Sequence, residues 1–277
     1  MSRQCYNDMF AVCEGEHVEM TQVEAIFSDY DGTLCPLELR REDAFISPRL
    51  RRVLTKASKR IKLGIITTKD LYFIKDRVPF AHGYAATSGL EMQVGDRITL
   101  DERVREPNQK IEKVYQDTLK EILQIREPIM VERKETEGGD LIAFCIDWRL
   151  SRNWDEAHRK AAPVLTLCKE QGMYVVESNI SPFANIFPFE VDKGAAFAKL
   201  RTEMGVRGPV MYLGDSEADD PAFQLADISV GIKHQRIMPP LKCKYRLEFF
   251  ELEVFLSKLI DSDFNFQDGM LQRNTQG

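Results

Sequence analysis

The sequence lacks the features that mark several large classes of protein. Its six cysteines form no Cys-x-x-Cys pair and no short Cys/His spacing, which excludes a zinc ribbon and argues against a disulfide framework. No apolar run approaches the ~18 residues of a membrane span, and residues 1–20 hold three glutamates but no apolar stretch of a secretory signal. The net charge of −6 shows no basic excess for binding nucleic acid. We therefore expect a cytoplasmic protein with neither nucleic acid nor a membrane as partner.

What is present is an ordinary globular composition with an α/β rhythm. The 277 residues, 43% of them hydrophobic, suffice for one large or two modest domains. Short apolar runs that end in polar loops predict buried strands at 23–28, 61–66 and 82–87. Helices are expected between them, one starting at Ser47-Pro48 and one near Leu71.

The middle of the chain has a different pattern. Its expected elements are an amphipathic helix at 108–125, a β-hairpin formed by 129–134 and 141–148, a helix at about 154–171, and strands at 173–177 and 184–187. This order predicts an α+β module with an antiparallel sheet.

The α/β rhythm then resumes towards the end of the chain. We expect a helix at about 193–204, strands at 209–213 and 226–230, and a loose tail over the last twelve or so residues. A parallel sheet built from both ends of the chain would gather its loops at one carboxyl edge, where ligands bind.

Two acidic loops follow expected strands. Asp29-Tyr30-Asp31-Gly32-Thr33 follows the first strand, and Gly214-Asp215-Ser216 opens a second acidic loop that continues to Asp219. Carboxylate and carbonyl oxygens are hard ligands that suit Mg²⁺, and two such loops repel each other unless a cation bridges them. The alternative is a plain turn in the first loop and an acidic first turn of a helix in the second.

Two further positions are weak signals when taken alone. Thr67 ends the second expected strand, where a hydroxyl can bind a phosphate oxygen. Lys193 begins a helix just after Asp192, although a helix N-terminus favours an anion rather than a cation. An anionic group close to Lys193 would explain its position, and a solvated lysine is the alternative.

The order of these four loops resembles the four motifs of the haloacid dehalogenase-like (HAD) phosphatase superfamily over about residues 22–262. The 126 residues between Thr67 and Lys193 exceed one crossover, which places the extra module between the second and third motifs, the C2 cap position. The resemblance implies an α/β fold: a Rossmann-like parallel-sheet core with an inserted α+β cap of the C2B type. The implied divisions are an N-terminal extension at 1–21, core at 22–102, cap at 103–186, core at 187–262 and a C-terminal tail at 263–277.

Within that superfamily the chain looks most like the trehalose-6-phosphate phosphatases and related sugar phosphatases. The resemblance rests on Glu132-Arg133-Lys134, on the strand ending in Trp148-Arg149, and on Asn185-Ile186-Phe187-Pro188 before Asp192-Lys193-Gly194. Three positions depart from that family: Asn185 replaces a glutamate, Thr67-Thr68-Lys69 replaces Ser-Gly-Arg, and Ser216 replaces a common aspartate.

The resemblance implies a role for each site residue. Asp29 would attack phosphorus and form an aspartyl-phosphate, while Asp31 would protonate the leaving sugar oxygen and later activate water. The resemblance also implies that the Asp29 side chain, the Asp31 carbonyl and Asp215 bind Mg²⁺, and that Lys193 and Thr67 bind the phosphate. Asp219 would orient Lys193 or metal-bound water. The cap residues that would bind the sugar are Glu132, Lys134 and Asn185.

The expected function is therefore a Mg²⁺-dependent phosphatase for a sugar phosphate, most of all trehalose 6-phosphate in trehalose biosynthesis. Open alternatives are sucrose 6-phosphate or mannosyl-3-phosphoglycerate as substrate, a phosphomutase of the same fold, and a regulatory protein without activity. Trp148 and Trp154 either stack on the sugar or pack within the cap, with packing the commoner role. Nothing in the sequence sets an oligomeric state.

Overall fold

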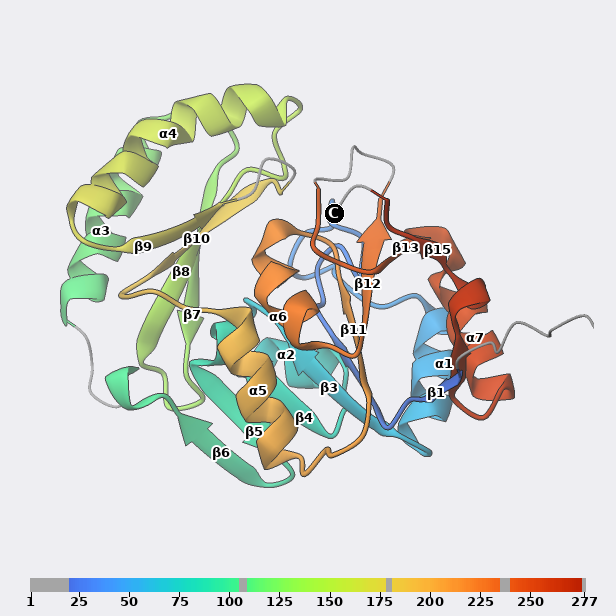
Figure 1. The fold of residues 1–277 in the computed structure, drawn as a ribbon. Coiled ribbons are helices and arrows are strands. Elements are labelled where there is room, and N and C mark those ends of the chain that lie inside the picture. Colours follow the sequence, from blue (N-terminus) through green and yellow to red (C-terminus); the bar gives the residue numbers. More distant parts are fainter. Residues whose placement is uncertain (1–19, 105–108, 178–180, 235–239, 276–277) are drawn as a thin grey trace, which may run out of the picture.

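The computed structural model describes residues 20–104, 109–177, 181–234 and 240–275, and its centre is a nine-stranded sheet (Figure 1). The strand order is β15-β13-β12-β11-β2-β3-β4-β5-β6. Six neighbouring strands run parallel: β13 (Tyr245–Glu248), β12 (Ile228–Lys233), β11 (Val210–Gly214), β2 (Ala25–Ser28), β3 (Lys62–Ile66) and β4 (Gly83–Ala86). The edge strands β5 (Glu91–Val94), β6 (Arg97–Leu100) and β15 (Gln272–Arg273) are antiparallel to their neighbours.

Helices cover both faces of this sheet because side chains alternate between the faces along each strand. Ile26 packs with α1 (Pro48–Ser58), α2 (Leu71–Arg77) and α7 (Leu252–Asp261). Phe27 belongs to the cluster on the other face, with α5 (Lys193–Glu203) and α6 (Asp220–Leu225). Both ends of the chain thus build one α/β core, and the predicted fold class is confirmed.

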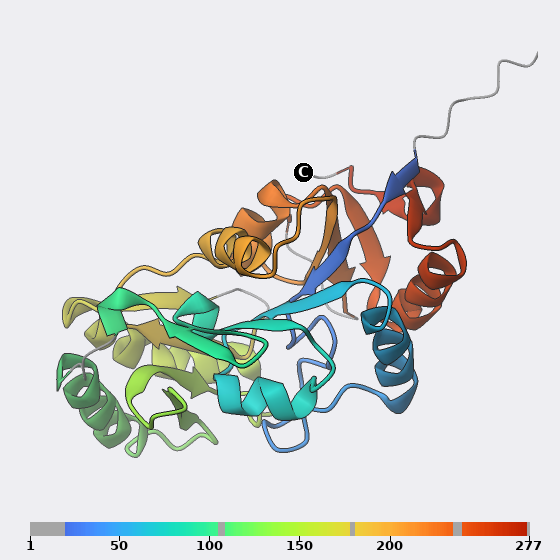
Figure 2. The same ribbon diagram turned by 90° about the horizontal axis from the view of Figure 1, so that it is seen from below.

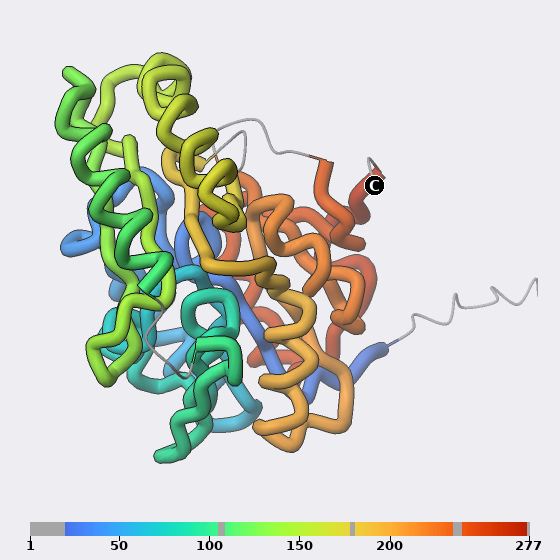
Figure 3. Tube along the Cα trace, turned by 90° about the vertical axis from the view of Figure 1, so that its left-hand side faces the viewer, coloured from blue at the N-terminus to red at the C-terminus, as the bar shows by residue number. Residues whose placement is uncertain are grey.

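A second, smaller unit is inserted between β6 and α5, and we call it the cap. Its antiparallel sheet has the order β7-β8-β10-β9, formed by β7 (Met130–Glu135), β8 (Leu141–Asp147), β10 (Phe183–Phe187) and β9 (Tyr174–Glu177). Helices α3 (Gln109–Ile122) and α4 (Trp154–Glu170) form its outer layer, so that the cap sheet lies between them and the core (Figures 1 and 3). The predicted α+β character of this module is confirmed.

The chain ends differ from the sequence-based expectation. Residues 265–267 (β14) pair with β1 (Met20–Gln22), and β15 adds to the edge of the core sheet, so the predicted loose tail is wrong for this segment. Phe266 is buried in the core, which explains the ordering of a stretch that looked polar overall. Figure 2 shows β1 beside the C-terminal elements. Residues 1–19 of the extension predicted at 1–21 lie outside the described residues, and its last two residues belong to β1.

Short 3-10 turns complete the described structure: η1 (Thr87–Gly89), η2 (Glu102–Val104), η3 (Glu217–Asp219), η4 (Phe249–Glu251) and η5 (Asp268–Met270). Among the described residues, no helix combines the length and the apolar character needed to cross a lipid bilayer. Among the described residues, Cys35, Cys145, Cys168 and Cys243 are buried free thiols.

Candidate active site

The two predicted acidic loops meet at the carboxyl edge of the core sheet. Strands β2 and β11 are parallel neighbours, with Ser28 opposite Leu213. Asp29 therefore leaves the end of one strand and Asp215 leaves the end of the next. Both side chains are almost fully buried, at 6% and 4% exposed, so the topology brings together two carboxylates that are 186 positions apart in the chain.

Lys193 joins these carboxylates from the start of α5. Asp192 caps this helix by accepting hydrogen bonds from the backbone N–H groups of Gly194 and Ala195. The Lys193 Nζ lies 3.1 Å from Asp29 Oδ1 and 2.7 Å from Asp219 Oδ1. These are the anionic neighbours that the sequence analysis required for a lysine at a helix N-terminus.

Asp219 is fully buried, and both of its carboxylate oxygens are occupied. Oδ1 accepts from Lys193 and from the Tyr212 hydroxyl, the latter at 2.7 Å. Oδ2 accepts from the backbone N–H groups of Asp215 and Ser216, both at 3.1 Å. This arrangement suits a residue that orients Lys193 and stabilises the loop after β11.

The site carries more buried negative charge than its lysine can balance. Burial raises the pKa of Asp29 to about 7, against the effect of Lys193 and with a further contribution from Asp219. Burial also raises the pKa of Asp215 well above its ordinary value, and Asp29 and Asp219 add to this. Burial opposes the charge on Lys193, but Asp219 and Asp29 outweigh it and raise the pKa of the ammonium. A divalent cation would relieve this excess.

The donor set fits such a cation. Asp29, Asp215 and Asp219 each offer a carboxylate oxygen, and these oxygens lie within 4.8 Å of one another. Because the Asp219 oxygens already have partners, Asp29 and Asp215 provide the available side-chain oxygens. Hard oxygen ligands in small number suit Mg²⁺, which keeps several waters of its own. The carbonyl of Asp31 as a third ligand stays a prediction.

Magnesium is expected to stabilise the folded chain. Binding to the native state alone contributes about 2.7 kcal/mol at 100 times the dissociation constant, which raises the melting temperature of a protein of this size by several degrees. Thermal unfolding with and without Mg²⁺ measures the shift. Asp215→Asn should lose it, whereas Asp220→Asn, at the start of α6 next to Asp219 but outside the cluster, should keep it. An equal shift in both variants would place the ion elsewhere.

Without metal, the stability of the chain should fall as the pH rises. The pKa of Asp29 is 3.8 in an ordinary setting and about 7 in the fold. Its contribution is therefore complete below pH ~3.8 and is lost as the pH rises through about 7. In EDTA, we expect the melting temperature of Asp29→Asn to rise relative to wild type between pH 5 and pH 8. A difference that stays constant over this range would contradict the prediction.

The acidic loop after β2 is held close to Asp215 by a glycine. Gly32 has a φ of +79°, and a Cβ at this position would lie 2.0 Å from Asp215 Oδ2. The backbone of one acidic loop thus packs directly against the carboxylate of the other. Only glycine permits both the left-handed conformation and this approach.

We therefore expect Gly32→Ala to disrupt the site more than an alanine does at another glycine with positive φ, where only backbone strain acts. Gly95→Ala is the matched control, because Gly95 also has a positive φ, +58°, but has no atom within 4 Å of the Cβ position. We expect Gly95→Ala to cost about 1 kcal/mol and Gly32→Ala to cost more and to lower activity at least tenfold. Denaturant unfolding and initial rates measure both. Equal effects would show that the contact with Asp215 is unimportant.

Asp31 lies beside Asp29 on the same loop and is also buried. Its Oδ2 is 3.3 Å from the Nζ of Lys69. Its Oδ1 is buried and has no hydrogen-bond partner in the described part of the chain. One carboxylate oxygen of Asp31 is thus held by Lys69, and the other can still accept a hydrogen bond.

Thr67 follows β3 at the same sheet edge, as predicted. It is buried, and its Oγ1 accepts a hydrogen bond of 3.2 Å from the backbone N–H of Lys69. The neighbouring Thr68 lines the cavity described below, whereas Thr67 does not. Phosphate binding by Thr67 stays a prediction.

The three predicted cap residues face the core. Glu132 forms ion pairs with Arg41 and Lys69 of the core, and although burial opposes its ionisation, Lys69 and Arg41 lower the pKa of Glu132 to about 2. Lys134 Nζ donates to the backbone oxygen of Thr68 at 2.7 Å and to the Asn185 side chain. Glu132 and Lys134 therefore join cap and core, and Asn185 lines the cavity between them.

This cavity holds about 40 Å³. Its wall is formed by core loops and by cap strands β9 and β10: Asp29, Asp31, Leu37, Thr68, Val176, Glu177, Ser181, Phe183, Asn185, Lys193, Asp215, Ser216 and Ala218. Pockets for small molecules usually measure ~300–1,000 Å³, so the cap must move away from the core to admit a substrate.

Two basic residues of the core that pair with the cap residue Glu132, Lys69 and Arg41, were not predicted as site residues from the sequence. Lys69 was noted only as a departure from Ser-Gly-Arg, although a basic residue two positions beyond a strand-end threonine was a usable signal. Arg41 lies in a loop and has no such signal. Trp148 is 2% exposed and stacks on His158 inside the cap cluster, so of the two alternatives for this tryptophan packing is confirmed.

Comparison with known proteins gives no matching family model. The chain is 27% identical over 219 residues to the probable trehalose-phosphate phosphatase I of Arabidopsis thaliana, which covers 72% of this chain and 56% of that protein. It is 27% identical over 207 residues to phosphoglycolate phosphatase 2 of Saccharolobus solfataricus, covering 75% of this chain and 78% of that protein. The chain thus spans about half the length of the plant relative.

Solved structures show the same fold. The C-terminal domain of the C. albicans trehalose-6-phosphate phosphatase matches with a TM-score of 0.70 and 18% identity, over 87% of this chain and 93% of that one. A haloacid dehalogenase-like hydrolase from Bacteroides thetaiotaomicron matches with a TM-score of 0.61 and 16% identity, over 86% and 99%. The chain therefore has the haloacid dehalogenase-like fold with an inserted cap. The two relatives compared by sequence are named as phosphatases, and one of them is a probable trehalose-phosphate phosphatase.

Proposed function

We propose that this chain is a Mg²⁺-dependent phosphomonoesterase that hydrolyses a sugar phosphate, with trehalose 6-phosphate as the first candidate. The observation that carries the proposal is the contact of Asp29 with the Lys193–Asp219 pair, beside Asp215 and beneath a closed cap. The plant relatives support the substrate class, since they are named as trehalose-phosphate phosphatases. Three residues of the cavity wall depart from that family: Asn185 stands where it has a glutamate, and Thr68 and Ser216 are the other two.

Asp29 is the nucleophile in this proposal. Its carboxylate attacks phosphorus, the bond from phosphorus to the sugar oxygen breaks, and Asp31 gives its proton to that oxygen, so that an aspartyl-phosphate and the free sugar result. Water then attacks phosphorus, Asp31 takes a proton from that water, and inorganic phosphate leaves while the Asp29 carboxylate is restored. Lys193 binds the phosphoryl oxygens as their charge develops.

Asp29 and Asp215 hold the metal in this proposal, with the Asp31 carbonyl as a third ligand. When bound, Mg²⁺ supplies positive charge near the phosphoryl oxygens. The seated cap excludes bulk water from the first step, and its opening admits water for the second. Asn185 is the predicted cap residue that lines the cavity and is therefore placed to contact the sugar.

Phosphate release from a panel of esters tests the proposal. The panel contains trehalose 6-phosphate, sucrose 6-phosphate, mannosyl-3-phosphoglycerate, glucose 6-phosphate and phosphoglycolate, each with Mg²⁺ or with EDTA. We expect Mg²⁺-dependent release with the highest kcat/KM for trehalose 6-phosphate. Preference for another ester would change the proposed substrate but would still support a phosphatase. No release from any ester by folded protein would overturn the phosphatase proposal in favour of a mutase or a regulatory protein.

A further inference from the structure

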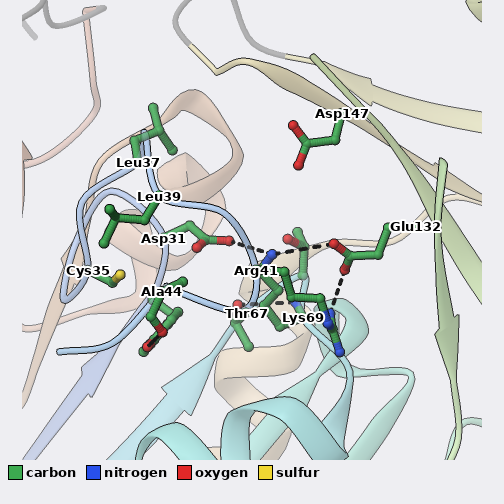
Figure 4. A network of polar contacts seen from close by, with 12 residues as sticks. Asp31, Cys35, Leu37, Leu39, Arg41, Ala44, Thr67, Lys69, Glu132 and Asp147 are labelled. Atoms are coloured by element: carbon green, nitrogen blue, oxygen red, sulfur yellow. Dashed lines mark hydrogen bonds and ion pairs between the residues drawn. The ribbon is translucent and has the colours of Figure 1, made fainter. Parts of the chain in front are cut away.

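A buried lysine connects the Asp31 loop with the cap. Lys69 is 3% exposed and follows β3 at the carboxyl edge of the core sheet. Its Nζ lies 3.3 Å from Asp31 Oδ2 and 3.9 Å from Glu132 Oε2 on cap strand β7 (Figure 4). One ammonium group thus lies between a carboxylate of the core and a carboxylate of the cap.

Glu132 is held from a second side by Arg41. The Arg41 Nη1 donates to Glu132 Oε1 at 2.5 Å (Figure 4). Its Nη2 pairs with Asp70. Asp70 caps α2 by accepting from the backbone N–H of Phe73, and the Phe73 ring lies 4.5 Å from the Arg41 guanidinium and 5.3 Å from Lys69 Nζ. The start of α2 therefore fixes both cations, and Glu132 is the member of the group that belongs to the cap.

The two oxygens of Asp31 are in different situations. Lys69 holds Oδ2, whereas Oδ1 is buried and has no hydrogen-bond partner among the described residues. A buried carboxylate oxygen without a partner is costly, and a reacting group in the cavity would supply the missing partner. Asp31 lines that cavity with Asp29 and Lys193.

We propose that Lys69 is a positioning residue, which holds Asp31 by Oδ2 and so directs Oδ1 at the leaving oxygen, and that Glu132 completes this arrangement only when the cap is seated. The proposal rests on the proposed function, in which Asp31 transfers the proton. It gives Glu132 a role that differs from sugar binding, because both of its oxygens are already engaged by core cations. Closure of the cap therefore also completes the positioning of the Asp31 carboxyl group for proton transfer.

Leaving-group dependence is the readout that a merely structural role would not move. Proton transfer by a positioned acid contributes about 10²–10⁴-fold for a poor leaving group, whereas p-nitrophenol needs little help. For Lys69→Met, we expect kcat/KM for the preferred sugar phosphate to fall about 100-fold and kcat/KM for p-nitrophenyl phosphate to fall less than about fivefold, because kcat/KM excludes the later attack of water that both esters share. Lys69→Arg should restore most of the loss, and Glu132→Gln should show the same selectivity with a smaller, roughly tenfold effect.

Lys75→Met is the matched control. Lys75 also joins core to cap, by a 2.5 Å ion pair with Glu137 at the tip of the β7–β8 hairpin, but it contacts neither Asp31 nor Glu132 in the described structure. It should lower both rates equally and by less than about threefold, as expected for an exposed ion pair. An equal loss on both substrates in Lys69→Met would overturn the positioning role. If wild type releases phosphate from neither ester, the proposed function fails instead.

Hydrogen exchange tests the link to the cap without any turnover. In Glu132→Gln, amide exchange should become several-fold faster both in β7 and in the loop at residues 29–35, because Lys69 loses its cap partner. In Lys75→Met, faster exchange should be confined to the β7–β8 hairpin. If Glu132→Gln leaves exchange at 29–35 unchanged, the coupling of the cap to Asp31 is wrong, whether or not any phosphate ester is hydrolysed.

Discussion

Asp29→Asn should abolish phosphate release while the fold stays intact. The amide lacks the anionic oxygen that attacks phosphorus, and loss of a nucleophile typically lowers kcat by about 10⁴-fold or more. The fold should tolerate the change, because burial raises the pKa of Asp29 to about 7 and a neutral side chain suits that setting. Steady-state rates with trehalose 6-phosphate and a melting curve in EDTA measure the two effects.

The control for this variant is Asp96→Asn, an exposed aspartate in the turn between β5 and β6. It makes the same chemical change far along the chain from the acidic loops and should leave rate and stability unchanged. If Asp29→Asn retained more than about 1% of wild-type kcat, a different group would be the nucleophile. Loss of activity together with early melting would point to a structural role for Asp29.

Lys193→Met should lower both activity and stability. Lys193 forms ion pairs with two buried carboxylates, those of Asp29 and Asp219. Removal of one member of a buried ion pair typically costs about 3–5 kcal/mol, since the remaining charges lose their partner. Loss of a cation that stabilises the developing phosphoryl charge typically lowers kcat by about 10²–10³-fold. Denaturant unfolding and initial rates measure the two losses independently.

Lys199→Met is the matched control on the same helix. Lys199 lies almost two turns after Lys193 and is only partly buried, so its replacement should change stability by less than about 0.5 kcal/mol. Mg²⁺ should offset part of the stability loss in Lys193→Met, because the dication neutralises Asp29 and Asp215. A variant that is unstable yet fully active would contradict the role of Lys193 at the phosphate.

The contacts that hold the cap on the core also involve residues beside the candidate active site. The closed cavity of about 40 Å³ is smaller than a sugar phosphate, so catalysis requires the cap to separate from the core and return. The ion pairs of Glu132 with Arg41 and Lys69 join cap to core, so in the proposed cycle they would be broken and remade. Exposed ion pairs contribute little, but these are largely buried and therefore set the closed geometry.

The sequence by itself determined the local elements and the order of the four loops. A strand such as β2 is predicted by a short apolar run that ends at Asp29, and the start of a helix such as α5 is predicted by its N-cap residue Asp192. Such signals lie within a few residues of one another, which is why periodicity and end residues suffice to find them. The position of the insertion followed from the spacing of Thr67 and Lys193 in the same way.

Some elements had no adequate local signal. Edge strands β5 and β6 are partly exposed and lack a continuous apolar run, and β14 has only Phe266 fully buried. Strands of this kind are stabilised by pairing with a neighbour rather than by their own residue pattern. These strands therefore form because a neighbouring strand is available for pairing, which the local sequence does not show.

The tertiary structure alone decided how the charges of the site are paired. Parallel pairing of β2 with β11 brings Asp29 to Asp215, and packing of the cap on the core brings Glu132 to Arg41 and Lys69. The partners in each case are tens to hundreds of positions apart, and a lysine or a glutamate has the same local sequence signature whether it is solvated or buried. Burial and partner depend on which surfaces meet, and no short stretch of sequence contains that information.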